Sequence, residues 1–118
     1  MSMKQLNRLI KSIRFASRGI AIAFQEQTFK ILVGAAGGVV VLILLLPLRQ
    51  WEVIIVLMLV TLVLVLEVLN SVFERIADMV EPRIHSYVKE IKDLMAGAVL
   101  IAAIASAVIG ILIFYPYL

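Results

Sequence analysis

The sequence predicts an all-α membrane protein with an amphipathic surface helix near its N-terminus and three transmembrane helices. Three observations predict this fold. Of the 118 residues, 64% are hydrophobic, whereas soluble domains are close to half apolar. The apolar residues are gathered into runs that approach the roughly 20 residues needed to cross a bilayer as a helix. The segment before the first run has a basic face and an apolar face, which is typical of a helix in the membrane interface.

The predicted surface helix covers residues 3–24. Its apolar residues recur at helical spacing on one side and its basic residues lie on the other. We expect the basic face to meet anionic headgroups, with a soluble helix packed on a partner as the alternative. The basic face comprises Arg8, Lys11, Arg14 and Arg18.

The first predicted transmembrane helix covers residues 29–48, and Pro47 marks its end. Gly34 and Gly38 form a small-xxx-small pair that would let helix backbones approach closely, although such spacing also arises by chance in apolar runs. The turn at residues 49–52 is so short that the next helix must run back antiparallel.

The second and third predicted transmembrane helices cover residues 52–80 and 90–117. The apolar run 53–66 is too short to span alone, so its helix must continue past Glu67 and Asn70. These two residues are therefore expected at the membrane boundary, and an acidic residue at that depth indicates function.

Lysine and arginine predict the orientation of the chain. Apart from Arg49, they all lie in the N-terminal segment up to Lys30 or within residues 74–93. By the positive-inside rule, both segments are cytoplasmic and the C-terminus is outside. The absence of cysteine excludes disulfides and thiolate metal sites, and nucleic-acid binding is not expected of a chain largely in lipid.

One face of the second membrane helix carries a line of polar residues. At about 100° per residue these side chains fall within roughly 60° of one line. Carboxylates beside other oxygen donors suit Mg²⁺, which binds through one or two carboxylates plus phosphates. Asp78 and the neighbouring Arg75 are interpreted as reaching water. The line consists of Glu67, Asn70, Ser71, Glu74 and Asp78.

Further candidates lie at the same boundary. Lys92 and Asp93 begin the third span, where a lysine can meet polyphosphate or simply extend to the interface. His85 and Glu26 are also candidates. Neither a phosphate-binding loop of the G-x-x-x-x-G-K type nor a protein-kinase signature is present.

These residues resemble a known pattern, that of the prokaryotic diacylglycerol kinase and undecaprenol kinase family. The pattern is E-x-x-N-(S/T)-x-x-E-x-x-x-D, then P-x-x-H, then K-D-x-x-A-(A/G)-A-V. It is met from Glu67 to Asp78, from Pro82 to His85 and from Lys92 to Val99. The resemblance covers essentially the whole chain, residues 1–118, as one lipid kinase domain. It implies a bacterial cytoplasmic-membrane protein that forms a homotrimer with active sites shared between subunits.

The resemblance also implies roles for individual residues. Glu67 would take the proton from the lipid hydroxyl and, with Ala96, meet the lipid, while Asn70 would orient the reacting groups. Glu26 and Glu74 would hold the Mg²⁺ that accompanies ATP. The nucleotide side would comprise Arg8, Phe15, Glu26, Glu74, His85, Lys92 and Asp93.

The reaction expected is ATP- and Mg²⁺-dependent phosphorylation of a membrane lipid alcohol. Diacylglycerol is the first expected substrate, undecaprenol the alternative, and a small proton-coupled transporter the distant alternative. Two departures from the family bear on the lipid. Leu32 stands where many undecaprenol kinases have histidine, and Ala96 stands where proteobacterial diacylglycerol kinases commonly have a polar residue.

Overall fold

The computed structural model describes residues 1–80 and 85–118, and the side chain of His85 lies outside the described part. Every element in the described part is helical, which confirms the all-α prediction. The order along the chain is α1 (Met3–Ala23), α2 (Gln27–Leu45), α3 (Gln50–Val80), α4 (His85–Phe114) and the short 3-10 helix η1 (Tyr115–Tyr117).

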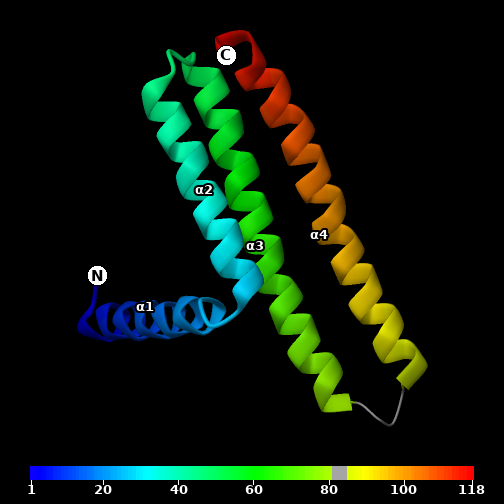
Figure 1. Ribbon diagram of the computed structural model, residues 1–118. Coiled ribbons are helices and arrows are strands. Elements are labelled where there is room, and N and C mark those ends of the chain that lie inside the picture. Colours follow the sequence, from blue (N-terminus) through cyan, green and yellow to red (C-terminus); the bar gives the residue numbers. More distant parts are fainter. Residues whose placement is uncertain (81–84) are drawn as a thin grey trace.

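Three of these helices lie side by side, and α1 runs across their long direction (Figure 1). The central helix is α3, which packs mainly against α4 and also against α2. Helices α2, α3 and α4 are each long and apolar enough to cross a membrane. The C-terminal end lies beside the α2–α3 connection, at the opposite end from α1 (Figure 1). The described residues thus contain three helices that are able to span a membrane, in the predicted order.

The first spanning helix differs from its predicted range of 29–48. It begins at Gln27, directly after Glu26 as N-cap, and ends at Leu45. It stops before Pro47 because a residue that precedes proline is restricted to extended conformations. Leu46 is extended, with φ −102° and ψ 148°.

The third spanning helix also differs from its predicted range of 90–117. It begins at His85 and gives way after Phe114 to the 3-10 helix that contains Pro116. The early start carries α4 beyond its apolar run, so that Lys92 lies within a continuing helix rather than at its first turn.

The start of α3 lies inside the segment predicted as a turn, because Glu52 caps the helix. Its Oε1 accepts a hydrogen bond of 2.9 Å from the backbone N–H of Arg49, as the third helical residue does in a capping box. The same oxygen accepts a hydrogen bond from the Tyr117 hydroxyl. Glu52 is only 7% exposed. This carboxylate therefore joins the α2–α3 connection to the C-terminal end of the chain.

We expect Tyr117→Phe to lower the thermal stability of the purified protein. The substitution removes one of the two hydrogen bonds to a buried carboxylate oxygen, and a hydrogen bond to a charged group contributes to stability. The expected effect is a fall of a few degrees in the midpoint of thermal unfolding in detergent. Tyr115→Phe is the matched control, since Tyr115 is largely exposed. Equal midpoints for the two variants would contradict this role for Tyr117.

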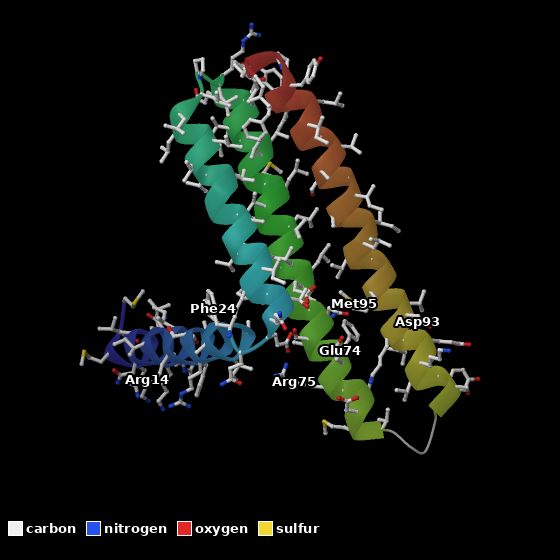
Figure 2. All side chains as sticks on the ribbon, viewed as in Figure 1. Arg14, Phe24, Glu74, Arg75, Asp93 and Met95 are labelled. Carbon is white, nitrogen blue, oxygen red and sulfur yellow. The ribbon has the colours of Figure 1, made fainter. Side chains whose placement is uncertain are left out.

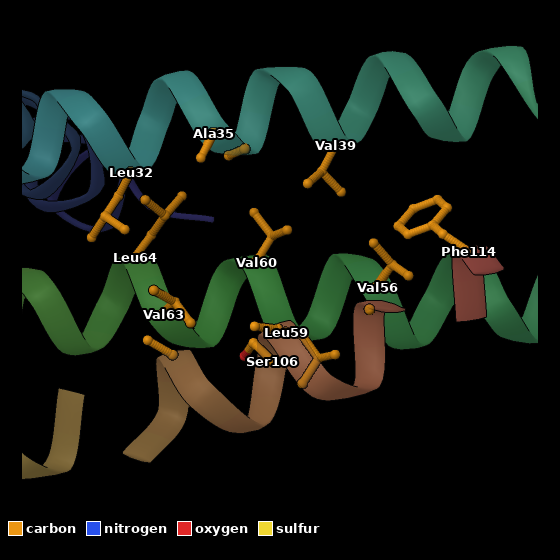
Figure 3. A pocket seen from close by; sticks show the side chains of 14 residues that line it. Leu32, Ala35, Val39, Val56, Leu59, Val60, Val63, Leu64, Ser106 and Phe114 are labelled. Atoms are coloured by element: carbon orange, nitrogen blue, oxygen red, sulfur yellow. The ribbon is translucent and has the colours of Figure 1, made fainter. Parts of the chain in front are cut away.

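The spanning helices leave most of their large apolar side chains exposed, and few are buried within the chain. A surface of this kind suits contact with lipid or with another subunit. Between α2, α3 and α4 lies a cavity of about 320 Å³ with almost wholly apolar walls. Figure 3 shows this cavity, into which α4 contributes Ser106 and Phe114. The Ser106 hydroxyl is buried and has no hydrogen-bond partner within the described residues.

Candidate active site

The candidate site is built on the half of α3 that lies towards Val80, where two polar side chains are buried. Glu67 is 4% exposed and Ser71 is 5% exposed. They are four residues apart and therefore lie on the same helix face. The Ser71 hydroxyl lies 3.2 Å from the Glu67 carbonyl oxygen. A carboxylate is thus buried on the face of α3 that also carries Ser71.

Glu26 meets this face of α3 from the joint between α1 and α2. The joint is compact because Phe24 and Phe29 pack edge to face, with ring centroids 5.0 Å apart. The Ser71 hydroxyl donates to Glu26 Oε2 at 2.5 Å. Arg75 Nη1 donates to Glu26 Oε1 at 3.1 Å. Both oxygens of the Glu26 carboxylate are therefore held by residues of α3.

Asn70 and Glu74 extend the site towards the exposed end of α3. Asn70 Nδ2 donates to Glu74 Oε1 at 3.2 Å. Asn70 Oδ1 is buried and has no partner among the residues that the structure describes. Glu26 and Glu74 are both close enough to Glu67 to interact with it electrostatically. Three carboxylates and one unused amide oxygen thus share this region, and Figure 2 labels Glu74 and Arg75 within it.

A salt bridge joins α3 to α4 beside this group. Lys92 Nζ lies 2.7 Å from Asp78 Oδ1. The side chains of Lys92 and Asp78 are both partly exposed, so this salt bridge lies at the border of the site and not at its buried centre. Lys92 thereby brings a positive charge from α4 to the polar face of α3.

Sequence comparison decides the family. The sequence model of the prokaryotic diacylglycerol kinase family matches residues 14–114, which is most of the chain. The chain belongs to the prokaryotic diacylglycerol kinase family. The predicted resemblance is therefore confirmed, and the matched residues include every position of the polar line on α3.

Two relatives in this family differ in their named substrates. Undecaprenol kinase of Bacillus subtilis is 37% identical over 115 residues, which cover 97% of this chain and 94% of that protein. Diacylglycerol kinase of Synechocystis sp. is 36% identical over 104 residues, which cover 86% of this chain and 59% of that protein. The second relative is thus considerably longer than the part that it shares with this family member.

Some predicted site residues of this family member are exposed on the surface of the single chain. Arg8 and Phe15 are exposed on α1, and Arg18 rather than a site residue stands over the Phe15 ring, 5.7 Å from its centroid. Asp93 is exposed on α4 and points away from α3 (Figure 2). Ala96 is also exposed.

The prediction for the His85 side chain lies outside the described residues. The backbone of His85 begins α4, and its side chain therefore stays a prediction.

Two contacts of the site were missed by sequence reasoning. Arg75 and Asp78 were expected to reach water, and both are exposed, yet each forms an ion pair. Arg75 pairs with Glu26, 49 residues away, and no local pattern in the sequence indicates that partner. The only sequence signal is that Arg75 lies one turn from Ser71, the other residue that holds Glu26.

The donor set fits the divalent cation that this kinase family implies. Within the described part of the chain, no three acidic or histidine side chains converge as a complete metal site. Mg²⁺ does not require one, because it is typically held by one or two carboxylates with water and phosphate oxygens as its other ligands. Glu26 and Glu74 supply two carboxylates, although Ser71 and Arg75 hold both oxygens of Glu26 in this structure. Asn70 Oδ1, which has no partner among the described residues, is a further hard oxygen donor.

Proposed function

We propose that this protein is an integral-membrane lipid kinase, which transfers the γ-phosphoryl group of ATP to the hydroxyl group of a membrane lipid alcohol. The observation that carries the proposal is the buried Glu67 carboxylate on a spanning helix of a kinase-family chain. An acidic group at such a place is energetically costly, so a functional role is its default interpretation. The proposed kinase domain comprises residues 1–118.

Glu67 is proposed as the general base. The lipid hydroxyl oxygen attacks the γ-phosphorus, its proton passes to the Glu67 carboxylate, and the bond from the γ-phosphorus to the ADP oxygen breaks. Asn70 lies one turn from Glu67, and its amide oxygen has no partner among the described residues, so it is proposed to orient the reacting groups. Phosphoryl transfer depends mainly on such positioning and on charge neutralisation.

The phosphates of ATP are proposed to bind beside Glu67, with Glu26 and Glu74 holding Mg²⁺. Bound there, the ion would neutralise phosphate charge and help to align the γ-phosphoryl group. Lys92 supplies positive charge at the same boundary. The proposed nucleotide contacts are Arg8, Phe15, Glu26, Glu74, His85, Lys92 and Asp93.

The lipid substrate is proposed to be diacylglycerol or undecaprenol, with its hydroxyl at Glu67 and Ala96 along its path. Both substrates occur in the names of relatives. The relative named undecaprenol kinase matches nearly the full length of both chains, which favours undecaprenol more than the residue pattern alone does. Either lipid has its hydroxyl near the headgroup region, at the level expected for Glu67.

The protein is proposed to lie in the bacterial cytoplasmic membrane with its N-terminus in the cytoplasm and its C-terminus outside. The distribution of lysine and arginine supports this orientation. Helix α1 is proposed to lie on the cytoplasmic membrane surface. Its direction across the spanning helices (Figure 1) is compatible with that position.

A homotrimer with shared active sites is proposed for the assembled protein. Within one chain Asp93 points away from α3 (Figure 2), so a neighbouring subunit would be needed to bring it to a nucleotide at Glu74. Gly34 and Gly38 have open space at their Cα atoms within the described chain. That space would allow a helix of another subunit to approach closely.

A phosphorylation assay tests the proposed function. Purified protein in mixed micelles with labelled ATP and Mg²⁺ is expected to transfer label to diacylglycerol or to undecaprenol when each is supplied separately. Comparing the two rates decides the preferred lipid, and micelles without added lipid alcohol are the control. If neither lipid acquires label, the kinase proposal fails, and a proton-coupled transporter becomes the hypothesis to test.

A further inference from the structure

Glu26 is engaged by a protein cation at the position where the proposed function places a metal ion. Its Oε1 lies 3.1 Å from Arg75 Nη1, and its Oε2 accepts the hydrogen bond from Ser71. A divalent cation and a guanidinium both neutralise the negative charge of the carboxylate that they bind. A metal ion bound at Glu26 Oε1 would lie close to the Arg75 guanidinium, and the two positive charges would repel each other.

We propose that Arg75 competes with the divalent cation for Glu26 and so sets the affinity of the site for metal. Arg75 acts through Glu26 and is a positioning residue rather than a catalytic one. The inference rests on the proposed function in one respect, namely that Glu26 is a metal ligand. In the protein without nucleotide, the guanidinium takes the place of the metal's positive charge.

The charges around Glu26 explain why a substitute cation is useful. Glu26 and Glu74 both act electrostatically on Glu67, and like charges at close range disfavour one another. The positive charge of Arg75 offsets this repulsion while no metal is bound. Arg75 follows Glu74 directly in α3, so a displaced guanidinium would remain near the site, where it could pair with phosphate oxygens.

The structure also permits the exchange. The Arg75 side chain is 54% exposed and that of Glu26 is 27% exposed, and ion pairs at such exposure are weak. Ser71 is buried and holds the other oxygen of Glu26 independently. Arg75 can therefore leave without releasing Glu26 from α3.

Binding of Mn²⁺, measured by electron paramagnetic resonance on the detergent-solubilised protein without nucleotide, tests the proposal. Arg75→Gln is expected to bind Mn²⁺ about two- to fivefold more tightly than the unmodified protein, which corresponds to the strength of a partly exposed ion pair. Arg75→Lys keeps the charge and is expected to bind close to the unmodified value. Lys89→Gln removes one positive charge from α4 and is the matched control.

The gain must depend on Glu26, so adding Glu26→Gln to Arg75→Gln is expected to abolish it. Arg75→Met also removes the charge and keeps an unbranched aliphatic side chain. It replaces Arg75→Gln in the experiment if Arg75→Gln does not fold. Equal or weaker Mn²⁺ binding by the charge-removing variants would overturn the inference, because Arg75 would then only hold Glu26 in place. That result leaves the metal site itself standing. An absence of Mn²⁺ binding in all proteins would overturn both the inference and the proposed metal site.

Discussion

Glu67→Gln is expected to reduce lipid phosphorylation by at least about 100-fold at saturating ATP and Mg²⁺, because general-base catalysis typically contributes 10²–10⁴-fold to a rate. Glutamine has nearly the shape of glutamate but cannot take up the proton of the lipid hydroxyl. The loss should therefore fall on kcat rather than on the KM for ATP. The measurement is label transfer from ATP to lipid at several ATP concentrations.

The matched control for this experiment is Glu52→Gln. Glu52 is also a buried glutamate of α3, but it lies at the other end of the helix and bonds to Tyr117. We expect Glu52→Gln to affect stability far more than turnover. A folded Glu67→Gln protein that keeps full turnover would refute the base role, whereas equal loss in both variants would indicate a general effect on folding.

Glu74→Gln is expected to raise the Mg²⁺ concentration needed for half-maximal activity by about 10- to 100-fold, since even outer-shell changes at metal sites cost that much. The amide lacks the negative charge that attracts the ion, yet its oxygen can still accept the hydrogen bond from Asn70 Nδ2. The substitution thus separates metal binding from local packing. Activity is measured across a range of Mg²⁺ concentrations at fixed ATP.

Glu90→Gln provides the comparison, because Glu90 is an exposed acid on α4 outside the proposed metal site. Its Mg²⁺ requirement is expected to match that of the unmodified protein. An unchanged requirement in Glu74→Gln would remove Glu74 from the proposed metal ligands. Partial recovery of Glu74→Gln at high Mg²⁺ would support the assignment, because excess ion compensates for weaker binding.

The spanning helices were predictable because bilayer thickness and hydropathy act locally on the chain. The residues at which these helices begin and end were less predictable. Pro47 was expected to end α2, but its constraint on Leu46 ended the helix earlier. The start of α3 depends on Glu52, whose hydrogen bonds involve Arg49 and the distant Tyr117. Apolar periodicity contains no information about such bonds.

The polar face of α3 was predictable for a similar reason. Helical geometry alone places Glu67, Asn70 and Ser71 on neighbouring positions of one face, and the structure finds Glu67 and Ser71 buried there. The family resemblance added the proposed roles. No such rule joins Glu26 to Arg75, because their contact depends on how the α1–α2 joint meets α3.

The sequence by itself determined that this protein is helical, that three of its helices can cross a membrane, and that it carries the residue pattern of a lipid kinase family. These properties follow from hydropathy, helical periodicity and local motifs, all of which act between near neighbours in the chain. Only the tertiary structure decided that Ser71 and Arg75 hold Glu26, that Lys92 pairs with Asp78, and that Asp93 points away from α3. Those outcomes depend on how separate helices meet in space, which spacing along one chain does not specify.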